Sequence, residues 1–493
     1  MSISSQSLAN RSGLIMFAAV VLSSMLQISL LAHYLPKQLA GLWVLALTIA
    51  HYLMHFNFGL GPTLTREISF KLRGGAQASS DDLAAGRNIY ATASRMTNVF
   101  AVIAAVAGLV FGEILFLAHA PAEYKSDAAV AWLIFLFGTV MNLKSIAFFC
   151  AIEGAGVIHI AKLTRSAVML MNLVIMFIAL QLAPNSISVA IAYAVQGALA
   201  LSAGYIQLRR HTPVARGGGA SWEMARHLAK PSAKIMLAAL GSVLIFQTGN
   251  FAVAAKMGLS EVVKFDSLMR VGQAFLSLAL TPAFATIAIQ SSLFSRGSHD
   301  GLKQLAIFNT RHAVVTLSIL AGWFAVFHPL IVRVWLGETY VSPNMAVYLM
   351  LAMFILEVNH VSLITAAMAA GTFLYVPALI SGVAILVIAP FMASAYGVAG
   401  VVGTLFICQL ATNNWYVPLI ALERLGIPFL PYARGVLLPG LIALVSSLAL
   451  NGIALFATDH LNIIAQLTCA TVLTGVMIFA ISRKAYSSLD PKH

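Results

Sequence analysis

Charged residues are scarce in this 493-residue chain. Asp, Glu, Lys and Arg make up 9% of it, whereas hydrophobic residues make up 60% and the mean hydropathy is +0.90. A soluble domain has about 25% charged and about 45–50% apolar residues. A water-soluble core cannot take up this much apolar surface. The composition therefore excludes an ordinary soluble protein and predicts one for which lipid is the solvent.

Cysteine is also rare, and the sequence motifs of soluble enzymes are missing. Cys150, Cys408 and Cys469 each lie in an apolar run without a Cys-x-x-Cys pair, which excludes a disulfide framework and a cysteine metal or redox site. The sequence has no phosphate-binding glycine loop, no His-Glu-x-x-His and no Gly-x-Ser-x-Gly. We therefore expect the protein not to be an enzyme and to bind no cofactor or metal.

Long apolar runs dominate the chain. A helix needs about 20 apolar residues to cross a bilayer, and backbone groups in lipid must bond within the segment. The runs predict an all-α polytopic membrane protein with about fourteen spans, at residues 13–33, 41–62, 88–118, 128–150, 163–182, 187–208, 234–255, 267–293, 312–334, 345–369, 374–392, 397–421, 435–456 and 463–482. The first run is long enough to span and is followed by further spans, which argues against a cleaved signal peptide.

The positive charge is unevenly placed along the chain. The formal net charge is +13, which in a soluble protein would suggest a nucleic-acid partner. With the N-terminus inside, 22 of the 29 Lys and Arg residues fall in inside segments and 5 in outside loops. This bias predicts cytoplasmic N- and C-termini in a bacterial inner membrane, and no nucleic-acid partner.

The two halves of the chain resemble each other. Residues 35–43 align with 257–265 at an offset of 222, and residues 151–156 with 366–371 at an offset of 215. The pattern predicts two six-span lobes that repeat in parallel about an axis along the membrane normal, with two appended C-terminal spans. Such lobes are typical of alternating access around a central cavity.

The expected organisation has four parts. They are an N-lobe at 1–210, a cytoplasmic linker at 211–233, a C-lobe at 234–423, and the last two spans with a cytoplasmic tail at 424–493. In the linker, the glycines at 217–219 predict a flexible break. Ser221 and Trp222 then predict the start of a short amphipathic helix on the membrane surface.

Residues 31–36 and 41–43 with 58–60 and 64–69 carry a family resemblance. In these segments the chain resembles the polysaccharide-transporter branch, with its Wzx-type flippases, of the multidrug/oligosaccharidyl-lipid/polysaccharide exporter superfamily. The resemblance extends loosely over most of the chain. It implies a flippase that moves undecaprenyl-pyrophosphate-linked oligosaccharide outward by alternating access, during biosynthesis of surface polysaccharide such as lipopolysaccharide or exopolysaccharide. It further implies a polysaccharide polymerase and a chain-length regulator as partners.

The chain also departs from its relatives. Many members of the branch carry an acid just before the Gly-Leu of the second span, where this sequence has Asn57 and Phe58. Drug exporters of the superfamily often use an acid in the first span, where Gln27 is the larger polar group here. The lipid II flippases use cavity arginines, one of them in span eight; Arg270 lies in that span, but the first span has no arginine.

Charged residues within spans are the candidate site residues, because a charge in lipid normally faces a cavity or a partner. Arg270 and Lys144 suit a pyrophosphate, and Glu357 suits a counter-ion or a proton acceptor. Asn142 falls on Glu357 at the offset of 215, so the same place is polar in both halves. The further cavity candidates are Arg95 and Asn359.

Each candidate has a structural alternative. Arg270 can pair with Asp266 one helical turn earlier, or extend to the membrane surface as Lys144 also can. Arg95 can be a topology charge. Two other functions are alternatives: a small-molecule exporter driven by an ion gradient, for which twelve spans would be more usual, and a membrane glycosyltransferase or polymerase, which the short outside loops disfavour.

Overall fold

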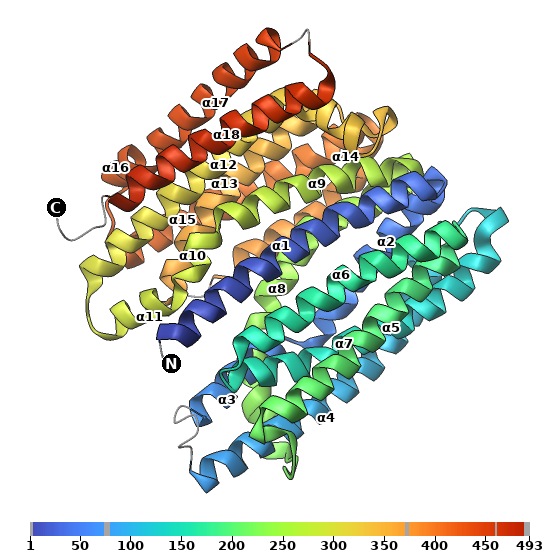
Figure 1. Cartoon of the computed structure of the whole chain (residues 1–493), viewed down its shortest axis with the longest axis vertical. Coiled ribbons are helices and arrows are strands. Elements are labelled where there is room, and N and C mark those ends of the chain that lie inside the picture. The colour runs from blue at the N-terminus through green and yellow to red at the C-terminus, as the bar shows by residue number, and fades with distance from the viewer. Residues whose placement is uncertain (1–2, 73–78, 370–373, 459–460, 488–493) are drawn as a thin grey trace. The chain divides into compact units, whose positions relative to one another are not determined.

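The structure is a computed structural model that describes residues 3–72, 79–369, 374–458 and 461–487. Within these ranges every regular element is helical, from α1 (Ile3–Tyr34) to α18 (Ile463–Ser487) (Figure 1). Eleven helical stretches of the described chain are long and apolar enough to cross a membrane. The predicted all-α, multi-pass membrane protein is confirmed.

The fourteen predicted spans can be followed in these helices. One of the eleven stretches, Val376–Leu425, covers the predicted eleventh and twelfth spans, and its helix α14 (Val376–Ala411) turns at Gly397, where φ is 62°. The fourteenth span is α18, whose described apolar part is Ile463–Ile478. The prediction of one continuous helix at 267–293 is wrong, because three helices occupy this segment.

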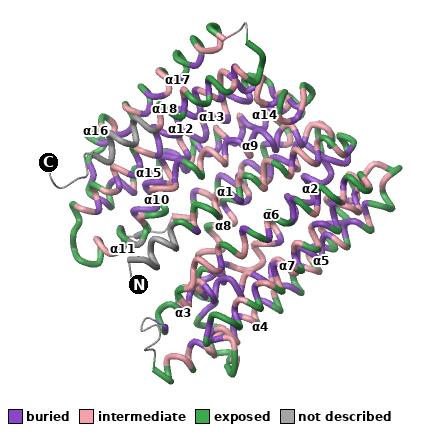
Figure 2. Tube along the Cα trace, in the orientation of Figure 1, coloured by how far each residue is buried: buried purple, intermediate pink, exposed green. Residues whose placement is uncertain are grey.

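Many helices carry exposed residues along their length (Figure 2), and many of these residues are large and apolar. On α4 (Ser80–Phe111) the exposed fractions of Val99, Val102 and Val106 are 57%, 64% and 58%. Their spacing of three and four residues places them on one helix face. A valine stripe of this exposure would be a liability in water, but it suits contact with lipid chains.

The chain divides into two compact units. Unit 1 comprises Met1–Val243 and Gly258–Val263, and unit 2 comprises Leu244–Met257 and Lys264–His493. The division falls inside α8 (Trp222–Met257) and α9 (Leu259–Ala279). A single helix, α8, therefore supplies residues to both units.

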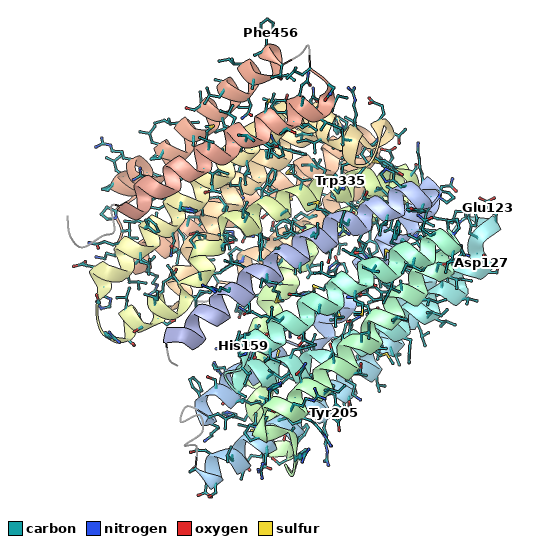
Figure 3. The ribbon with its side chains drawn as sticks, in the orientation of Figure 1. Glu123, Asp127, His159, Tyr205, Trp335 and Phe456 are labelled. Atoms are coloured by element: carbon teal, nitrogen blue, oxygen red, sulfur yellow. The ribbon has the colours of Figure 1, made fainter. Side chains whose placement is uncertain are left out.

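Unit 1 contains the first half of the chain. Its elements, besides α1 and α4, are α2 (Lys37–Met54), η1 (His55–Asn57), α3 (Leu60–Lys71), η3 (Gly112–Leu117), η4 (Ala122–Tyr124), α5 (Lys125–Gly154), α6 (Ile158–Leu182), α7 (Ser186–His211) and η5 (Pro213–Ala215). Glu123 and Asp127, before and in the first turn of α5, mark one end of this unit, and His159 and Tyr205 lie toward the other (Figure 3).

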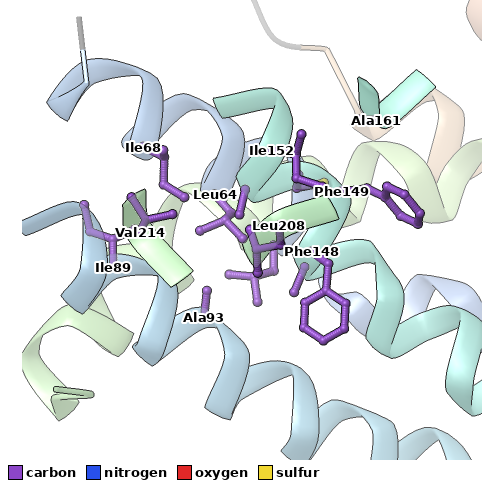
Figure 4. Packing of buried hydrophobic residues seen from close by; sticks show 14 of the residues in the cluster. Leu64, Ile68, Ile89, Ala93, Phe148, Phe149, Ile152, Ala161, Leu208 and Val214 are labelled. Atoms are coloured by element: carbon purple, nitrogen blue, oxygen red, sulfur yellow. The ribbon is translucent and has the colours of Figure 1, made fainter. Parts of the chain in front are cut away.

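The buried core of unit 1 is formed by residues from α3, α4, α5, α6, α7 and the linker. It includes Leu64, Ile68, Ile89, Ala93, Phe148, Ile152, Leu208 and Val214 (Figure 4). Leu228, in the first part of α8, belongs to the same cluster and is fully buried. The linker and the start of α8 are thus part of the packing of unit 1.

Small residues allow α5 and α7 to cross closely. A Cβ built on Gly197 would lie 2.4 Å from the Gly138 carbonyl oxygen, and one on Gly138 would lie 2.7 Å from Ala194 Cα. Such contacts between glycines are a common way for helices to pack in lipid.

The second span is interrupted between α2 and α3. Phe58 and Gly59 adopt positive φ values of 52° and 71°, and the Gly59 amide donates to Asn57 Oδ1 at 2.8 Å. A Cβ at Gly59 would lie 2.4 Å from the carbonyl oxygen of Ser232 in α8. Glycine is required here by both the backbone conformation and the close approach.

Unit 2 contains the second half. Its elements, besides the end of α8, most of α9, α14 and α18, are α10 (Thr281–Ala285), α11 (Ile287–Ser295), α12 (His299–Trp335), η6 (Glu338–Tyr340), α13 (Asn344–Ala369), α15 (Asn413–Leu425), α16 (Phe429–Tyr432), η7 (Ala433–Leu437) and α17 (Leu438–Ala457). Phe456, at the end of α17, points away from the helices and is 87% exposed (Figure 3).

The eighth span breaks into α9, α10 and α11 for a local reason. Pro282 cannot continue the hydrogen bonding of the preceding helix. Thr286 Oγ1 donates to the Pro282 carbonyl at 2.9 Å and accepts from Gln290 Nε2 at 3.0 Å and from Asn309 Nδ2 at 2.7 Å. Polar side chains of α10–α12 thus bond to one another and to the backbone beside the break.

The second spans of both halves are therefore interrupted, at residues 55–59 and 280–286. The internal repeat itself stays a prediction. Part of its second match, residues 370–371, lies outside the described residues.

The linker glycines pack against α4. Asn88 Oδ1 accepts from the Gly219 amide at 2.8 Å, and Arg87 Nε donates to the Pro213 carbonyl at 3.2 Å. A Cβ on Gly218 would lie 2.2 Å from the Arg87 carbonyl oxygen. The expectation of a flexible break is therefore wrong, because the glycines allow close contact.

The predicted helix start at Ser221 is confirmed, but the short separate helix is not. Ser221 Oγ accepts from the Met224 amide at 3.1 Å, as an N-cap does. The helix then continues through Pro231 as α8. Ser232 Oγ lies 2.9 Å from Thr63 Oγ1 and 2.7 Å from the Leu228 carbonyl, so α3 supports α8 beside the proline.

Gly218→Val is expected to detach the linker, since its side chain has no space against the Arg87 carbonyl and overpacking costs about 1–3 kcal/mol. Limited trypsin digestion of the full-length protein should then cut faster at Arg216. Gly219→Ala is the matched control, because its Cβ would meet Asn88 Oδ1 at an ordinary 3.9 Å. Equal cutting of both variants would contradict the docked linker.

Candidate functional site

Arg270 lies in α9 within a buried polar cluster of unit 2. Its Nε donates to Asp266 Oδ2 one turn earlier, and Asp266 Oδ1 accepts from Asn250 Nδ2 of α8 at 3.2 Å. The Arg270 and Asp266 side chains are 13% and 11% exposed. Removing two charges from water is costly, and here each charge compensates the other. The structure thus places Arg270 in the pairing that its spacing from Asp266 allowed.

A close helix contact brings α9 against α13. A Cβ on Gly272 would lie 2.1 Å from Phe354, whose ring stacks on Phe246 of α8 at 5.9 Å between centroids. Gly272 is two residues beyond Arg270, and Phe354 lies three residues before Glu357. Arg270 and Glu357 therefore lie on neighbouring helices of the same unit.

Glu357 lies in α13 and is 5% exposed. Its Oε2 lies 3.4 Å from His360 Nδ1, one turn further along the same helix. The two side chains are 7% and 12% exposed, and the contact is an ion pair only when His360 is protonated. The role of Glu357 as a counter-ion or a proton acceptor stays a prediction.

Further polar side chains of α13 reach other helices. Asn359 Oδ1 accepts from the Tyr432 hydroxyl of α16, and Ser362 Oγ lies 2.9 Å from Thr310 Oγ1 of α12. All four side chains are buried. Asn359 thus links α13 to α16 through this hydrogen bond. Its spacing of 73 residues from Tyr432 leaves no local signal in the sequence.

Lys144 and Asn142 lie in α5 of unit 1 and are partly exposed. Asn142 Nδ2 donates to the Gly138 carbonyl at 3.1 Å, so its amide nitrogen is used within its own helix. Lys144 has no carboxylate within ion-pair distance among the described residues. In this part of the chain, no carboxylate therefore neutralises its ammonium in the way that Asp266 neutralises the Arg270 guanidinium.

Arg95 lies on an exposed position of α4. Four of the six predicted site residues, Asn142, Arg270, Glu357 and Asn359, contact residues outside the six. The structure thus shows partners that the sequence reasoning did not assign to the site: Asn250, His360 and Tyr432. The three-residue spacing from Glu357 could have revealed His360, just as the four-residue spacing from Arg270 indicated Asp266, because helical residues so spaced share a face.

Comparison with known proteins gives no match to a family model and none to a curated protein. Solved structures do match. A lipid II flippase MurJ in an inward closed conformation gives a TM-score of 0.68 at 13% identity, over 97% of this chain and 99% of that one. An inward-facing multidrug resistance MATE family transporter of the MOP superfamily gives 0.63 at 14% identity, over 86% of this chain and 95% of that one.

A MOP superfamily transporter from Pyrococcus furiosus gives a TM-score of 0.59 at 12% identity, over 86% of this chain and 95% of that one. At identities this low, the structural similarity shows the fold alone. These neighbours are described as transporters, not as enzymes. The chain has the fold of the MOP superfamily transporters, among them MATE transporters and the flippase MurJ.

Proposed function

We propose that the protein is a flippase that moves undecaprenyl-pyrophosphate-linked oligosaccharide from the inner to the outer leaflet of a bacterial cytoplasmic membrane, for surface polysaccharide biosynthesis. The observation that carries the proposal is the extent of the likeness to MurJ. It covers 97% of this chain, whereas the likeness to the MATE transporter covers 86%. The similarity to the lipid II flippase thus extends over nearly the whole chain.

The proposed cargo carries a pyrophosphate, which favours cationic side chains. Lys144 of unit 1 offers a point charge, and Arg270 of unit 2 offers a guanidinium; each is a candidate to bind it on its own. Because Asp266 already binds Arg270, the phosphate and Asp266 compete for the same guanidinium. Such competition makes binding of an anion reversible, as a carrier requires.

A drug exporter driven by protons is the second candidate, and the Glu357–His360 pair favours it. Glu357→Gln separates the two functions, because the amide keeps hydrogen-bonding capacity but cannot carry a proton. We expect the variant to keep its glycan export, since an uncharged group repels no anion. Surface polysaccharide in the complemented deletion strain and proton-driven efflux of cationic drugs in everted vesicles measure the two activities. Drug efflux that is present in the wild type and abolished in the variant would favour the exporter instead.

The direct test is a strain from which the gene is deleted. We expect lost surface polysaccharide with lipid-linked repeat units trapped in the inner leaflet, and restoration by the wild-type protein. Normal polysaccharide with altered drug sensitivity would reject the flippase proposal. Polymerase and chain-length regulator partners follow from the same proposal, and loss of the protein should leave both without substrate.

A further inference from the structure

One face of α7 is exposed along most of the helix. Its exposed side chains recur every three or four residues, at Ile191, Val195, Ala198, Ser202, Tyr205 and Arg209. Ile191, Val195 and Tyr205 are 46%, 37% and 44% exposed, and in a chain that spans a membrane such a face contacts lipid. Arg209 continues this face one turn beyond Tyr205. Its guanidinium therefore belongs at the depth of the lipid head groups.

The start of α8 presents a similar pair of side chains at the same end of unit 1, since Leu208 and Leu228 share one buried cluster. Trp222 is 75% exposed, and the Arg226 guanidinium lies 5.8 Å from the centre of its ring. The Arg209 guanidinium lies 4.9 Å from the centre of the Tyr205 ring. An arginine stacked on an aromatic ring keeps the N–H groups at its edge available for a phosphate.

The segment that joins these two pairs is strongly basic. From residue 209 to residue 230 the sequence has five Lys and Arg residues and one acid, Glu223, and all six are exposed. The five cations are Arg209, Arg210, Arg216, Arg226 and Lys230. Among the described residues, none of the five has a carboxylate within ion-pair distance. We call these five cations, together with Tyr205 and Trp222, the linker surface.

Hydrogen bonds hold the backbone beneath the linker surface. Asn88 Oδ1 of α4 accepts from the Gly219 amide at 2.8 Å, and Thr92 Oγ1 of α4 accepts from the Ser221 amide at 3.3 Å. Glu67, the acid of α3 that reaches α8, contacts Arg66 and His227 instead of the five cations. An ordered backbone thus presents the cations, which lowers the entropic cost of binding a partner.

The chemistry of the linker surface indicates which partner it fits. Exposed tyrosine and tryptophan rings are typical of proteins at the depth of the head groups, and cations that cluster beside a span attract anionic lipids. A zwitterionic lipid has no net charge to offer five cations. A nucleic acid would match the charge, but not the lipid-facing side of α7 that ends in Tyr205 and Arg209.

We propose that the linker surface binds anionic phospholipids of the leaflet that borders it, with Arg209 and Arg226 donating to lipid phosphates beside the Tyr205 and Trp222 rings. Such binding anchors the segment between the two predicted lobes to the membrane surface. The linker surface includes neither Lys144 nor Arg270, and the proposal does not depend on the proposed cargo.

The test uses Trp222 of the full-length protein as the reporter, in phosphatidylcholine nanodiscs. A minor fraction of the lipid carries bromine on its acyl chains near the ester, either on phosphatidylglycerol or on phosphatidylcholine. Bromine quenches a nearby indole, and the difference between the wild type and Trp222→Phe isolates the Trp222 signal. We expect stronger quenching by the brominated phosphatidylglycerol. Arg226→Gln should lower this preference about fivefold, and high salt should lower it too.

The second pair is tested in the same way, with Tyr205→Trp as the reporter in the Trp222→Phe background. There Arg209→Gln should lower the preference by a similar factor. Arg333→Gln is the matched control, because Arg333 is an exposed arginine that already has a carboxylate partner in Glu338. Its preference should equal that of the wild type.

Three outcomes would overturn the proposal. Equal quenching of Trp222 by both brominated lipids would show that the surface does not select anionic lipid. Absence of quenching by either lipid would show that the surface faces water or a soluble partner. Displacement of the brominated phosphatidylglycerol by an equimolar amount of undecaprenyl pyrophosphate would assign the surface to the cargo instead.

Discussion

Lys144→Met is expected to lower export of the lipid-linked glycan about tenfold or more in a complemented deletion strain. Under the proposed function, the ammonium binds pyrophosphate, and a charge-assisted hydrogen bond is worth about 1.5–3 kcal/mol, or about tenfold or more in binding. The effect of substituting Lys144 is simpler to interpret than that of substituting Arg270, since Lys144 has no carboxylate partner among the described residues. The readout is surface polysaccharide together with inner-leaflet repeat units.

Two further variants complete the test of Lys144. Lys144→Arg keeps the charge and should retain most of the export. Lys37→Met removes a lysine from an exposed position at the start of α2 and should have no effect. Normal export by Lys144→Met, at wild-type protein levels, would remove Lys144 from the proposed site.

Asp266→Ala is expected to lower the free energy of unfolding by about 3 kcal/mol. The substitution takes away the carboxylate beside a guanidinium that is 13% exposed, and breaking a buried pair by removing one partner is strongly destabilising. The thermal unfolding midpoint of the detergent-solubilised protein measures the loss.

The double variant Asp266→Leu with Arg270→Met shows whether the loss comes from the uncompensated charge. Apolar residues of similar volume commonly replace a buried ion pair without loss of stability. We expect the double variant to recover most of the midpoint while failing to export glycan. If the two substitutions destabilise additively, the pair contributes no coupling energy and its neutralising role is wrong.

The spans were predictable because each requires about 20 apolar residues, a demand that the sequence shows directly. The interruptions were not. Pro282 ends the regular hydrogen bonding locally, and beside it Thr286 accepts from Gln290 and from Asn309, 23 residues away. The break at Phe58 and Gly59 depends on contact with Ser232 in another helix. Both breaks thus have partners that lie far away in the sequence.

The site was predictable to a similar degree. A charge inside an apolar run stands out, and helical spacing pointed to Asp266 as a partner of Arg270. The bond from Tyr432 to Asn359 arises from how α16 returns to α13, and no local pattern encodes that return. In the linker, a glycine run looks the same in sequence whether it permits motion or close packing.

The place where the first unit ends bears on how the chain can be cut. Val214 and Leu228 belong to the buried core of unit 1, although both follow the six spans of the first predicted lobe. A fragment that stops after the sixth predicted span would lack both side chains and leave a gap in its own interior. An N-terminal fragment that keeps this core intact therefore has to extend past Leu228.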